Sequence, residues 1–199
     1  MIDVPEFRRL YRVKRFDFWV AAVAVVAGLS AGVLAGVVIG IALSLLWLVY
    51  VATSPGMPLL GREPGTQVFR DVAENPDDET FPGYAVVRLD GGLFFATAEA
   101  LEERVRSLAL HADPSLRAVV LDLEGVDFVD SQGAAKLTEI LDFAESAGID
   151  LRLARLKPDV SKVLEKAGVL ELIGEDRLHG NVYRAVEAQI AADRRSRDR

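Results

Sequence analysis

The side chains best suited to chemistry in this sequence gather between residues 122 and 131. Four of them are carboxylates, at Asp122, Glu124, Asp127 and Asp130, and clustered carboxylate oxygens are the ligands that hard divalent cations prefer. Asp122 stands inside an apolar run that predicts a buried strand, whereas the other three occupy loop positions at which carboxylates are ordinarily solvated. We therefore predict no metal site in this segment.

The hydroxyl of Ser131 is the remaining candidate for chemistry, as a nucleophile between a strand and a helix. The strained turn that carries such a serine in hydrolases requires glycine two residues earlier, and Val129 stands there instead. The chain has no cysteine and two histidines, His111 and His179, neither of them close to Ser131 in the sequence. It also lacks the glycine-rich loops that bind nucleotide phosphates. We predict a protein that is not an enzyme and that binds no cofactor.

The segment Asp130-Ser131-Gln132-Gly133 is the candidate site that remains, because it joins a predicted buried strand to a predicted helix. A hydroxyl at the beginning of a helix accepts hydrogen bonds from free backbone amides, so we expect Ser131 to cap this helix. The same amides could also receive a phosphate group. In addition to the cap, we predict a regulatory, partner-facing turn at Asp130–Gly133.

The elements that position this turn follow from the periodicity of apolar residues. Strands are predicted at 66–72, 84–89, 93–96, 117–123 and 149–154. Amphipathic helices are predicted to begin near Thr97, Ser131, Pro158 and Asn181. The alternation predicts an α/β fold with a mixed β-sheet and amphipathic helices. Residues 62–199 carry 18 cations and 27 anions, and this net charge of −9 argues against a nucleic-acid partner.

Residues 18–52 form an apolar run of 35 residues that only glycines and serines interrupt. A single helix of this length would measure about 52 Å, whereas the hydrocarbon core of a bilayer is about 30 Å thick. A break in the glycine-rich segment 28–32 removes the mismatch. We therefore predict a transmembrane hairpin over residues 16–52, with helices at about 16–29 and 32–52.

Glycine recurs at every fourth position of the second predicted helix, at Gly32, Gly36 and Gly40. Such a stripe lets a second helix backbone approach closely, which is how helices associate in lipid. We predict that these glycines pack against another transmembrane helix.

Charge asymmetry gives the predicted orientation. Residues 1–17 carry five cations and three anions, and basic segments next to membrane helices stay in the cytoplasm. Two crossings return the acidic domain to the cytoplasm, whereas a single crossing would place it outside. The predicted organisation is a multi-pass protein of the cell (inner) membrane, with a basic cytoplasmic segment at 1–15, the hairpin at 16–52, a linker at 53–65, the α/β domain at 66–192 and a charged tail at 193–199.

Several stretches of this sequence resemble segments of known protein families. Val129-Asp130-Ser131-x-Gly133 after an apolar strand resembles the STAS domain, which sulfate transporters share with anti-sigma-factor antagonists. Residues 88–96, with the sequence Arg-Leu-Asp-Gly-Gly-Leu-Phe-Phe-Ala, are similar to a segment of SulP anion permeases. Further similarity to SulP proteins lies in their last two transmembrane helices, linker and tail, at residues 17–20, 58–62, 69–71, 153–157 and 173–174.

The resemblance implies the C-terminal portion of a SulP-type secondary anion transporter for sulfate or a similar anion, with a STAS domain as its cytoplasmic regulatory and interaction module. The implied partners are membrane lipid, the remaining transporter helices or another subunit, and a cytoplasmic regulatory protein. The alternative is a stand-alone, membrane-tethered STAS signalling adaptor of the anti-sigma-factor antagonist type.

Two departures from these families matter. The resemblance places the anion site of SulP proteins in earlier helices, and this chain matches only the last two. Gln132 stands where the antagonists carry their phosphorylated serine. Because glutamine accepts no phosphate, we expect no phosphate switch of that kind at this position.

Overall fold

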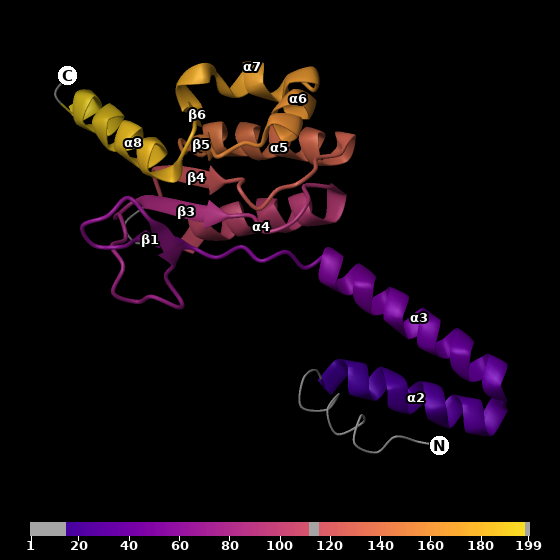
Figure 1. The fold of residues 1–199 in the computed structure, drawn as a ribbon. Coiled ribbons are helices and arrows are strands. Elements are labelled where there is room, and N and C mark those ends of the chain that lie inside the picture. The colour runs from indigo at the N-terminus through magenta and orange to yellow at the C-terminus, as the bar shows by residue number, and fades with distance from the viewer. Residues whose placement is uncertain (1–14, 112–115, 198–199) are drawn as a thin grey trace. The chain divides into compact units, whose positions relative to one another are not determined.

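The computed structural model describes residues 15–111 and 116–197, and the chain divides into two compact units, Met1–Thr53 and Ser54–Arg199. The first unit contains helices α2 and α3, and the second contains the β-strands and the remaining helices (Figure 1). Most of the predicted basic segment, at 1–14, and the last two residues of the predicted charged tail lie outside the described residues.

The first unit is a hairpin of two helices. Helix α2 spans Arg15–Ala31 and α3 spans Val33–Ala52. Gly32 joins them with a φ of +92°, a backbone conformation that glycine adopts at little cost because it lacks a Cβ atom. The predicted break therefore falls at the end of the glycine-rich segment, and α2 extends two residues beyond its predicted end.

The glycines of the predicted stripe have different environments. A Cβ atom on Gly36 would lie 2.6 Å from the Ala24 carbonyl oxygen and 2.8 Å from Cα of Gly28, and one on Gly40 would lie 3.3 Å from Cβ of Ala24. Gly36 and Gly40 thus face α2 within the same hairpin, and glycine at position 36 is what lets the two backbones approach so closely. Gly32 forms the turn instead.

One end of the hairpin carries aromatic side chains. Phe16, near the beginning of α2, stacks on Trp47 near the end of α3 at a centroid distance of 3.9 Å, and Trp47 stacks on Tyr50 at 5.4 Å. Among the described residues, α3 is the one helix with the length and apolar composition to cross a membrane, and the apolar part of α2, Phe18–Ala31, is shorter. Aromatic rings of this kind are enriched where membrane helices meet water.

The second unit contains a four-stranded sheet and a separate two-stranded hairpin. The four strands are parallel and lie in the order β3-β4-β5-β6. The strands are β1 Leu60–Arg62, β2 Phe69–Asp71, β3 Tyr84–Arg88, β4 Ala118–Asp122, β5 Asp150–Ala154 and β6 Leu178–His179. The helices are α4 Phe95–His111, α5 Ser131–Ser146, α6 Pro158–Lys166, α7 Val169–Ile173 and α8 Val182–Arg197, with a 3-10 turn at Glu175–Arg177.

The segment that follows α3 runs along the outer edge of β3 in the antiparallel direction. It makes isolated bridges at Leu59↔Val87 and Gly56↔Asp90. The sheet therefore has parallel and antiparallel neighbours, and the predicted α/β fold with a mixed sheet is confirmed.

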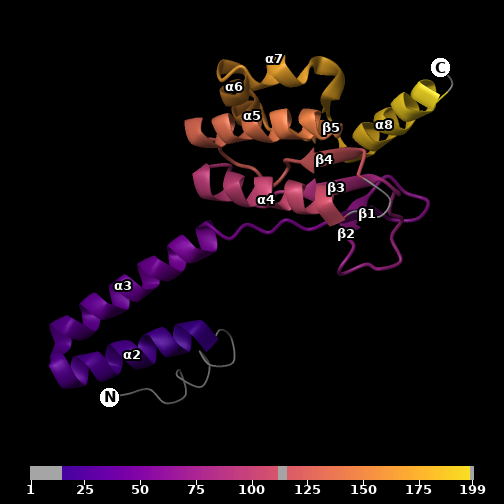
Figure 2. The same ribbon diagram turned by 180° about the vertical axis from the view of Figure 1, so that it is seen from behind.

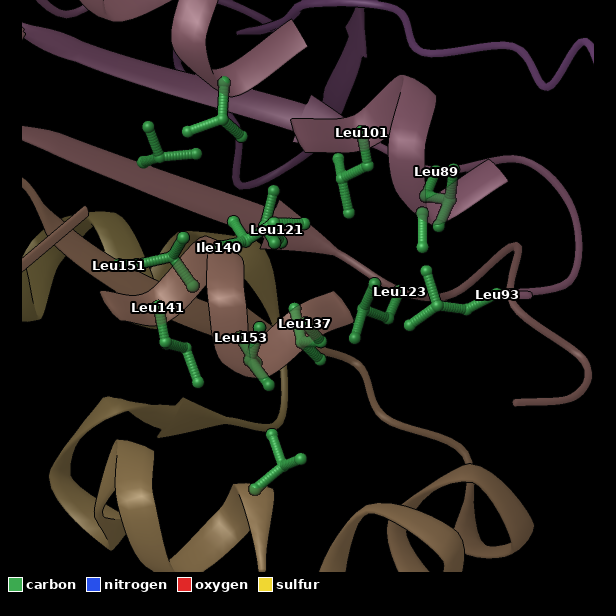
Figure 3. Packing of buried hydrophobic residues seen from close by; sticks show 14 of the residues in the cluster. Leu89, Leu93, Leu101, Leu121, Leu123, Leu137, Ile140, Leu141, Leu151 and Leu153 are labelled. Atoms are coloured by element: carbon green, nitrogen blue, oxygen red, sulfur yellow. The ribbon is translucent and has the colours of Figure 1, made fainter. Parts of the chain in front are cut away.

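The parallel sheet is covered on both faces (Figure 2). Helices α4, α5, α6 and α7 pack on one face, where leucines dominate the contacts; Figure 3 shows Leu137 and Ile140 of α5 against Leu121, Leu151 and Leu153 of the strands. Helix α8 and the β1–β2 hairpin cover the other face. Because β4 is buried along its whole length, its continuous apolar sequence is explained by cover on both sides.

The predicted strand at 93–96 is wrong. Leu93 keeps a single parallel bridge to Val129, and helix α4 already begins at Phe95. The hydroxyl of Thr97 accepts a hydrogen bond from the Phe94 amide at 3.0 Å and donates one to the Gly92 carbonyl oxygen at 2.6 Å. These bonds tie the chain into a turn where an extended strand was expected.

Two further elements differ from the sequence-based expectation. Strand β1 lies within residues 53–65, the segment that was predicted as a linker. It forms a strand by pairing with β2, which begins nine residues later in the chain. Helix α7, Val169–Ile173, has no counterpart among the elements predicted from the sequence.

Candidate functional site

The predicted partner-facing turn lies at the carboxyl edge of the parallel sheet, where the chain leaves β4 and enters α5. Asp130 has extended backbone angles and is the N-cap of α5. Its Oδ1 atom accepts a hydrogen bond from the Gly133 amide at 2.6 Å. Ser131 and Gln132 follow in the first helical turn with exposed side chains.

The expectation that Ser131 caps the helix is therefore wrong. A capping side chain belongs to the last residue that still has non-helical backbone angles, since only from there can it reach the amide three residues ahead. Asp130 holds that position, and Ser131 is the first residue of the helix itself.

A close approach between two loops fixes the turn. The Leu93 amide donates to the Phe128 carbonyl oxygen at 2.9 Å, and the Leu93 carbonyl oxygen accepts from the Asp130 amide at 3.2 Å. A Cβ atom on Gly133 would overlap that same Leu93 oxygen. Gly133 is thus required because the beginning of α5 rests on the backbone that follows β3.

At the same edge of the sheet, charged side chains from the ends of three neighbouring strands form an ion cluster around a buried carboxylate. Asp122 is fully buried at the end of β4, and its carboxylate accepts from Arg88 Nε at 2.8 Å and from Arg155 Nε at 2.8 Å. Arg155 also contacts Glu124, at 2.5 Å. Its φ of +58° makes it the only non-glycine residue with a positive φ in the described part of the chain.

The charges in this cluster support one another. Burial lowers the pKa of the Arg155 guanidinium, but the hydrogen bond from Arg155 to Asp122 and the negative charges of Asp122 and Glu124 outweigh burial, so that this pKa lies above its ordinary value. A buried carboxylate without such partners would be strongly unfavourable. Asp122 is therefore held by its two arginine partners as part of the structural scaffold.

The four carboxylates weighed above as metal ligands are each engaged by other groups in the structure. Asp122 and Glu124 pair with arginines, Asp127 contacts Lys157 at 2.6 Å, and Asp130 caps α5. Within residues 15–111 and 116–197 no group of three or more histidines and carboxylates is arranged to hold a metal ion.

Sequence reasoning missed the two arginines of the ion cluster. Arg88 and Arg155 lie 34 and 33 residues from Asp122 in the chain. The signal that was available is the placement of an arginine near the carboxyl end of each strand that flanks β4, since these ends share one edge of a parallel sheet.

A second polar cluster lies on the face of the sheet that α8 covers. Arg152 of β5 is buried, donates to Gln189 of α8 at 2.6 Å, and lies 3.2 Å from Nε2 of His179. Burial and the positive charge of Arg152 lower the pKa of His179, although Asp176 and Asp150 act in the opposite direction. This cluster attaches α8 to the sheet.

Comparison with known proteins gives the family. The STAS domain family matches residues 75–188, and the chain therefore belongs to the STAS domain family. Along its length it also matches the C-terminal portion of SulP sulfate transporters. Relatives include a probable sulfate transporter 4.2 of Arabidopsis thaliana, 28% identical over 96% of this chain and 29% of its own length, and a probable sulfate transporter of Mycobacterium tuberculosis, 32% identical over 94% and 34%.

Solved structures agree with this assignment. The murine Solute Carrier 26 family member A9 anion transporter, in its inward-facing state, is 22% identical and superposes with a TM-score of 0.80 over 95% of this chain and 31% of its own, which shows a shared fold. The STAS domain of a SulP transporter from Vibrio cholerae is 26% identical, with a TM-score of 0.50 over 62% of this chain and 93% of its own.

The chain spans about a third of the length of the curated relatives it matches. These curated relatives are transporters and not enzymes, and the similarity to SulP transporters along the chain indicates a membrane protein.

Proposed function

We propose that this chain is the C-terminal portion of a SulP-type secondary anion transporter of the sulfate class. In this proposal α2 and α3 are its last two transmembrane helices, and the STAS domain is a cytoplasmic regulatory and interaction module. The observation that carries the proposal is the extent of the similarity. Relatives named as sulfate transporters match 94–96% of the chain, across both the hairpin and the STAS domain.

The composition of the hairpin favours a structural role in the membrane over a role in substrate binding. No charged residue lies between Phe18 and Ala52, and the Ser30 hydroxyl donates to the carbonyl oxygen of Val26 in its own helix at 2.8 Å. Anion sites in transporters use helix ends and polar groups at the bilayer midplane. The anion site of the proposed transporter therefore belongs to its other helices.

The turn Asp130–Gly133 is the proposed partner-facing surface, and it works without phosphate. The Asp130 carboxylate already accepts a hydrogen bond from the Gly133 amide. The backbone of the turn is therefore fixed without a phosphate group. Gln132, exposed beside it, offers no atom that accepts a phosphate group. Gln132→Asp adds one charge to this surface, and we expect weaker binding of the regulatory partner with an unchanged melting temperature.

A chimera tests the transporter proposal. The C-terminal third of the Mycobacterium tuberculosis relative is replaced by residues 1–199, and uptake of radioactive sulfate is measured in liposomes. We expect uptake by the chimera and none by this chain alone. A chimera that is monodisperse and membrane-inserted but inactive, beside an active parent, would count against the proposal and favour the stand-alone adaptor.

Cysteine labelling tests the proposed orientation, because the chain contains no cysteine of its own. Glu6→Cys and Asp77→Cys should both resist a membrane-impermeant thiol reagent in intact cells. Asp77 is exposed, whereas its neighbour Asp78 is buried in an ion pair with Arg70 and is unsuitable as a probe. Labelling at position 77 alone would indicate a single crossing and an external STAS domain.

A further inference from the structure

Helix α8 is held on the sheet by small apolar side chains. It lies apart from the other helices of its unit and packs on the opposite face of the sheet (Figure 1). The buried residues that α8 and the central strands contribute to this face are valines and alanines, namely Val86, Val120, Ala154, Val182, Ala185 and Val186. Because apolar stabilisation scales with buried area, polar contacts carry a larger share of the attachment here than on the leucine-rich face.

The polar contacts of α8 centre on the buried guanidinium of Arg152, which is 5% exposed. Its Nε atom donates to Gln189 Oε1 of α8 at 2.6 Å. Its Nη1 atom donates to the Asp176 carbonyl oxygen at 3.1 Å and lies 3.2 Å from Nε2 of His179, and its Nη2 atom donates to Asp150 at 2.9 Å. One guanidinium thus joins β5, the 3-10 turn, β6 and α8.

This geometry requires a neutral imidazole at His179. A guanidinium nitrogen can only donate a hydrogen bond, so Nε2 of His179 must accept, and the ring carries its one proton on Nδ1. A second proton would occupy the acceptor position and place a positive charge 3.2 Å from the Arg152 nitrogen. Protonation therefore both breaks the contact and introduces repulsion inside a buried cluster.

The charged groups that face His179 come from β5 and the 3-10 turn. Burial and the positive charge of Arg152 lower the pKa of His179, and Asp176 and Asp150 oppose them with a smaller effect. Arg177 of the same turn pairs with Asp150 at 3.0 Å. The contribution of α8 to the cluster is an amide and carries no charge.

The contact with Arg152 continues along α8. The Gln189 side chain, which accepts from Arg152, also donates to Asp193 one turn later at 2.9 Å. Asp193 in turn accepts from the Tyr84 hydroxyl at 2.7 Å. These bonds form one connected network from β5 through α8 to β3, so a disturbance at Arg152 reaches the middle of the helix.

We propose that His179 is a pH-sensitive latch for α8: the neutral imidazole completes the Arg152 cluster and keeps α8 on the sheet, and protonation releases α8. The strands β3, β4 and β5 pair with one another without α8, so the rest of the domain stays folded. Release uncovers the apolar face at Val86, Val120 and Ala154. The inference concerns the STAS domain alone and does not depend on the proposed transport function.

The direction of the switch follows from proton binding. Docked α8 lowers the pKa of His179, so the released state binds more protons and acid favours it. The released population should rise about tenfold for each pH unit that separates the docked from the released pKa of His179.

Two single cysteines in the full chain test this release, because the chain contains none of its own. Val120 and Val119 are neighbours on β4 and are 1% and 0% exposed, but Val120 faces α8 and Val119 faces the other helices. Val120→Cys and Val119→Cys are labelled with an aromatic disulfide reagent from about pH 8 to about pH 5. Each rate is divided by the rate of the same variant in denaturant at the same pH.

We expect the corrected rate at position 120 to rise in acid while that at position 119 stays constant. His179→Gln, which keeps a neutral acceptor at every pH, should abolish the rise, and His111→Gln should preserve it. An equal rise at both positions would show global unfolding and overturn the latch. A constant rate at position 120, or a rise that persists in His179→Gln, would also overturn it.

Hydrogen exchange of the chain without cysteine substitutions gives a second measurement. Amides of α8 should exchange faster in acid, relative to their intrinsic rates, while amides of α5 do not. Equal protection of α8 at both ends of the pH range would contradict its release.

Discussion

Asp130 and Gly133 are joined by a hydrogen bond of 2.6 Å from the Gly133 amide to the Asp130 carboxylate. This bond closes the first turn of α5 at the point where the helix rests on the Leu93 backbone. A single turn thus combines a helix cap, a close backbone contact and two exposed polar side chains. The stability of the turn and its use as a surface therefore depend on different residues.

The cap predicts unequal effects at neighbouring positions. Asp130→Ala should lower the free energy of unfolding of the STAS domain by about 0.5–2 kcal/mol, because a helix amide loses its acceptor. Ser131→Ala should change it by less than about 0.5 kcal/mol, since this side chain is exposed and is not the cap. Urea unfolding of both variants measures the difference. Equal destabilisation by the two substitutions would contradict the assignment of Asp130 as the N-cap of α5.

Gly133→Ala should destabilise the domain because the added methyl group meets the Leu93 carbonyl oxygen. Forcing extra volume into a packed contact costs about 1–3 kcal/mol. Gln132→Ala, one residue earlier and exposed, is the matched control. Thermal unfolding of both variants measures the difference. A Gly133→Ala protein with the melting temperature of the wild type would show that the beginning of α5 can move away from the Leu93 backbone at little cost.

The ion cluster around buried Asp122 predicts a larger effect at Asp122 than at Asp127. Asp122→Ala removes the buried carboxylate that Arg88 and Arg155 share, and losing hydrogen bonds to a charged group costs about 1.5–3 kcal/mol. Asp127→Ala removes an exposed pair with Lys157, which is worth less than about 1 kcal/mol. Comparable losses in chemical denaturation would mean that the Asp122 pairs are solvated in solution.

Protonation of His179 should make the domain less stable in mild acid. Its pKa is lowered from 6.5 in the folded protein, so below that pH the unfolded chain binds more protons than the folded one, and stability falls as the pH decreases. Stability is complete above about pH 6.5, and the loss ends once the pH is below the folded pKa. His179→Gln should flatten this dependence, whereas His111→Gln, at the exposed end of α4, should not. Melting curves between pH 5 and 8 would reveal either pattern.

The STAS domain should fold without the hairpin, provided that it begins at Ser54. Residues 54–61 supply the Leu59↔Val87 bridge, the hydrogen bond from the Arg88 amide to the Pro58 carbonyl oxygen and buried Leu60. A fragment of residues 54–199 should unfold cooperatively, and a fragment of residues 62–199 should melt lower by about 2–4 °C for each kcal/mol lost. Identical melting temperatures would mean that this segment does not hold the edge of β3.

Local patterns in the sequence were sufficient for the two-helix hairpin, for β3, β4 and β5 with the helices that follow them, and for the family. Apolar length and a glycine-rich break predict two helices, and the turn between them falls on Gly32. The helix of Leu137, Ile140 and Leu141 follows from a spacing that places these side chains on one face. Each of these features depends on residues that are neighbours in the chain.

Only the tertiary structure decided which distant residues meet. The pairing of Asp122 with Arg88 and Arg155 depends on the register of three parallel strands, and the need for glycine at position 133 depends on where the Leu93 loop returns. The sequence does not predict strand β1, because three residues are too few to show an apolar period. This strand forms by pairing with β2. Local periodicity carries no information on register or loop return, because both are set by the packing of elements that lie tens of residues apart.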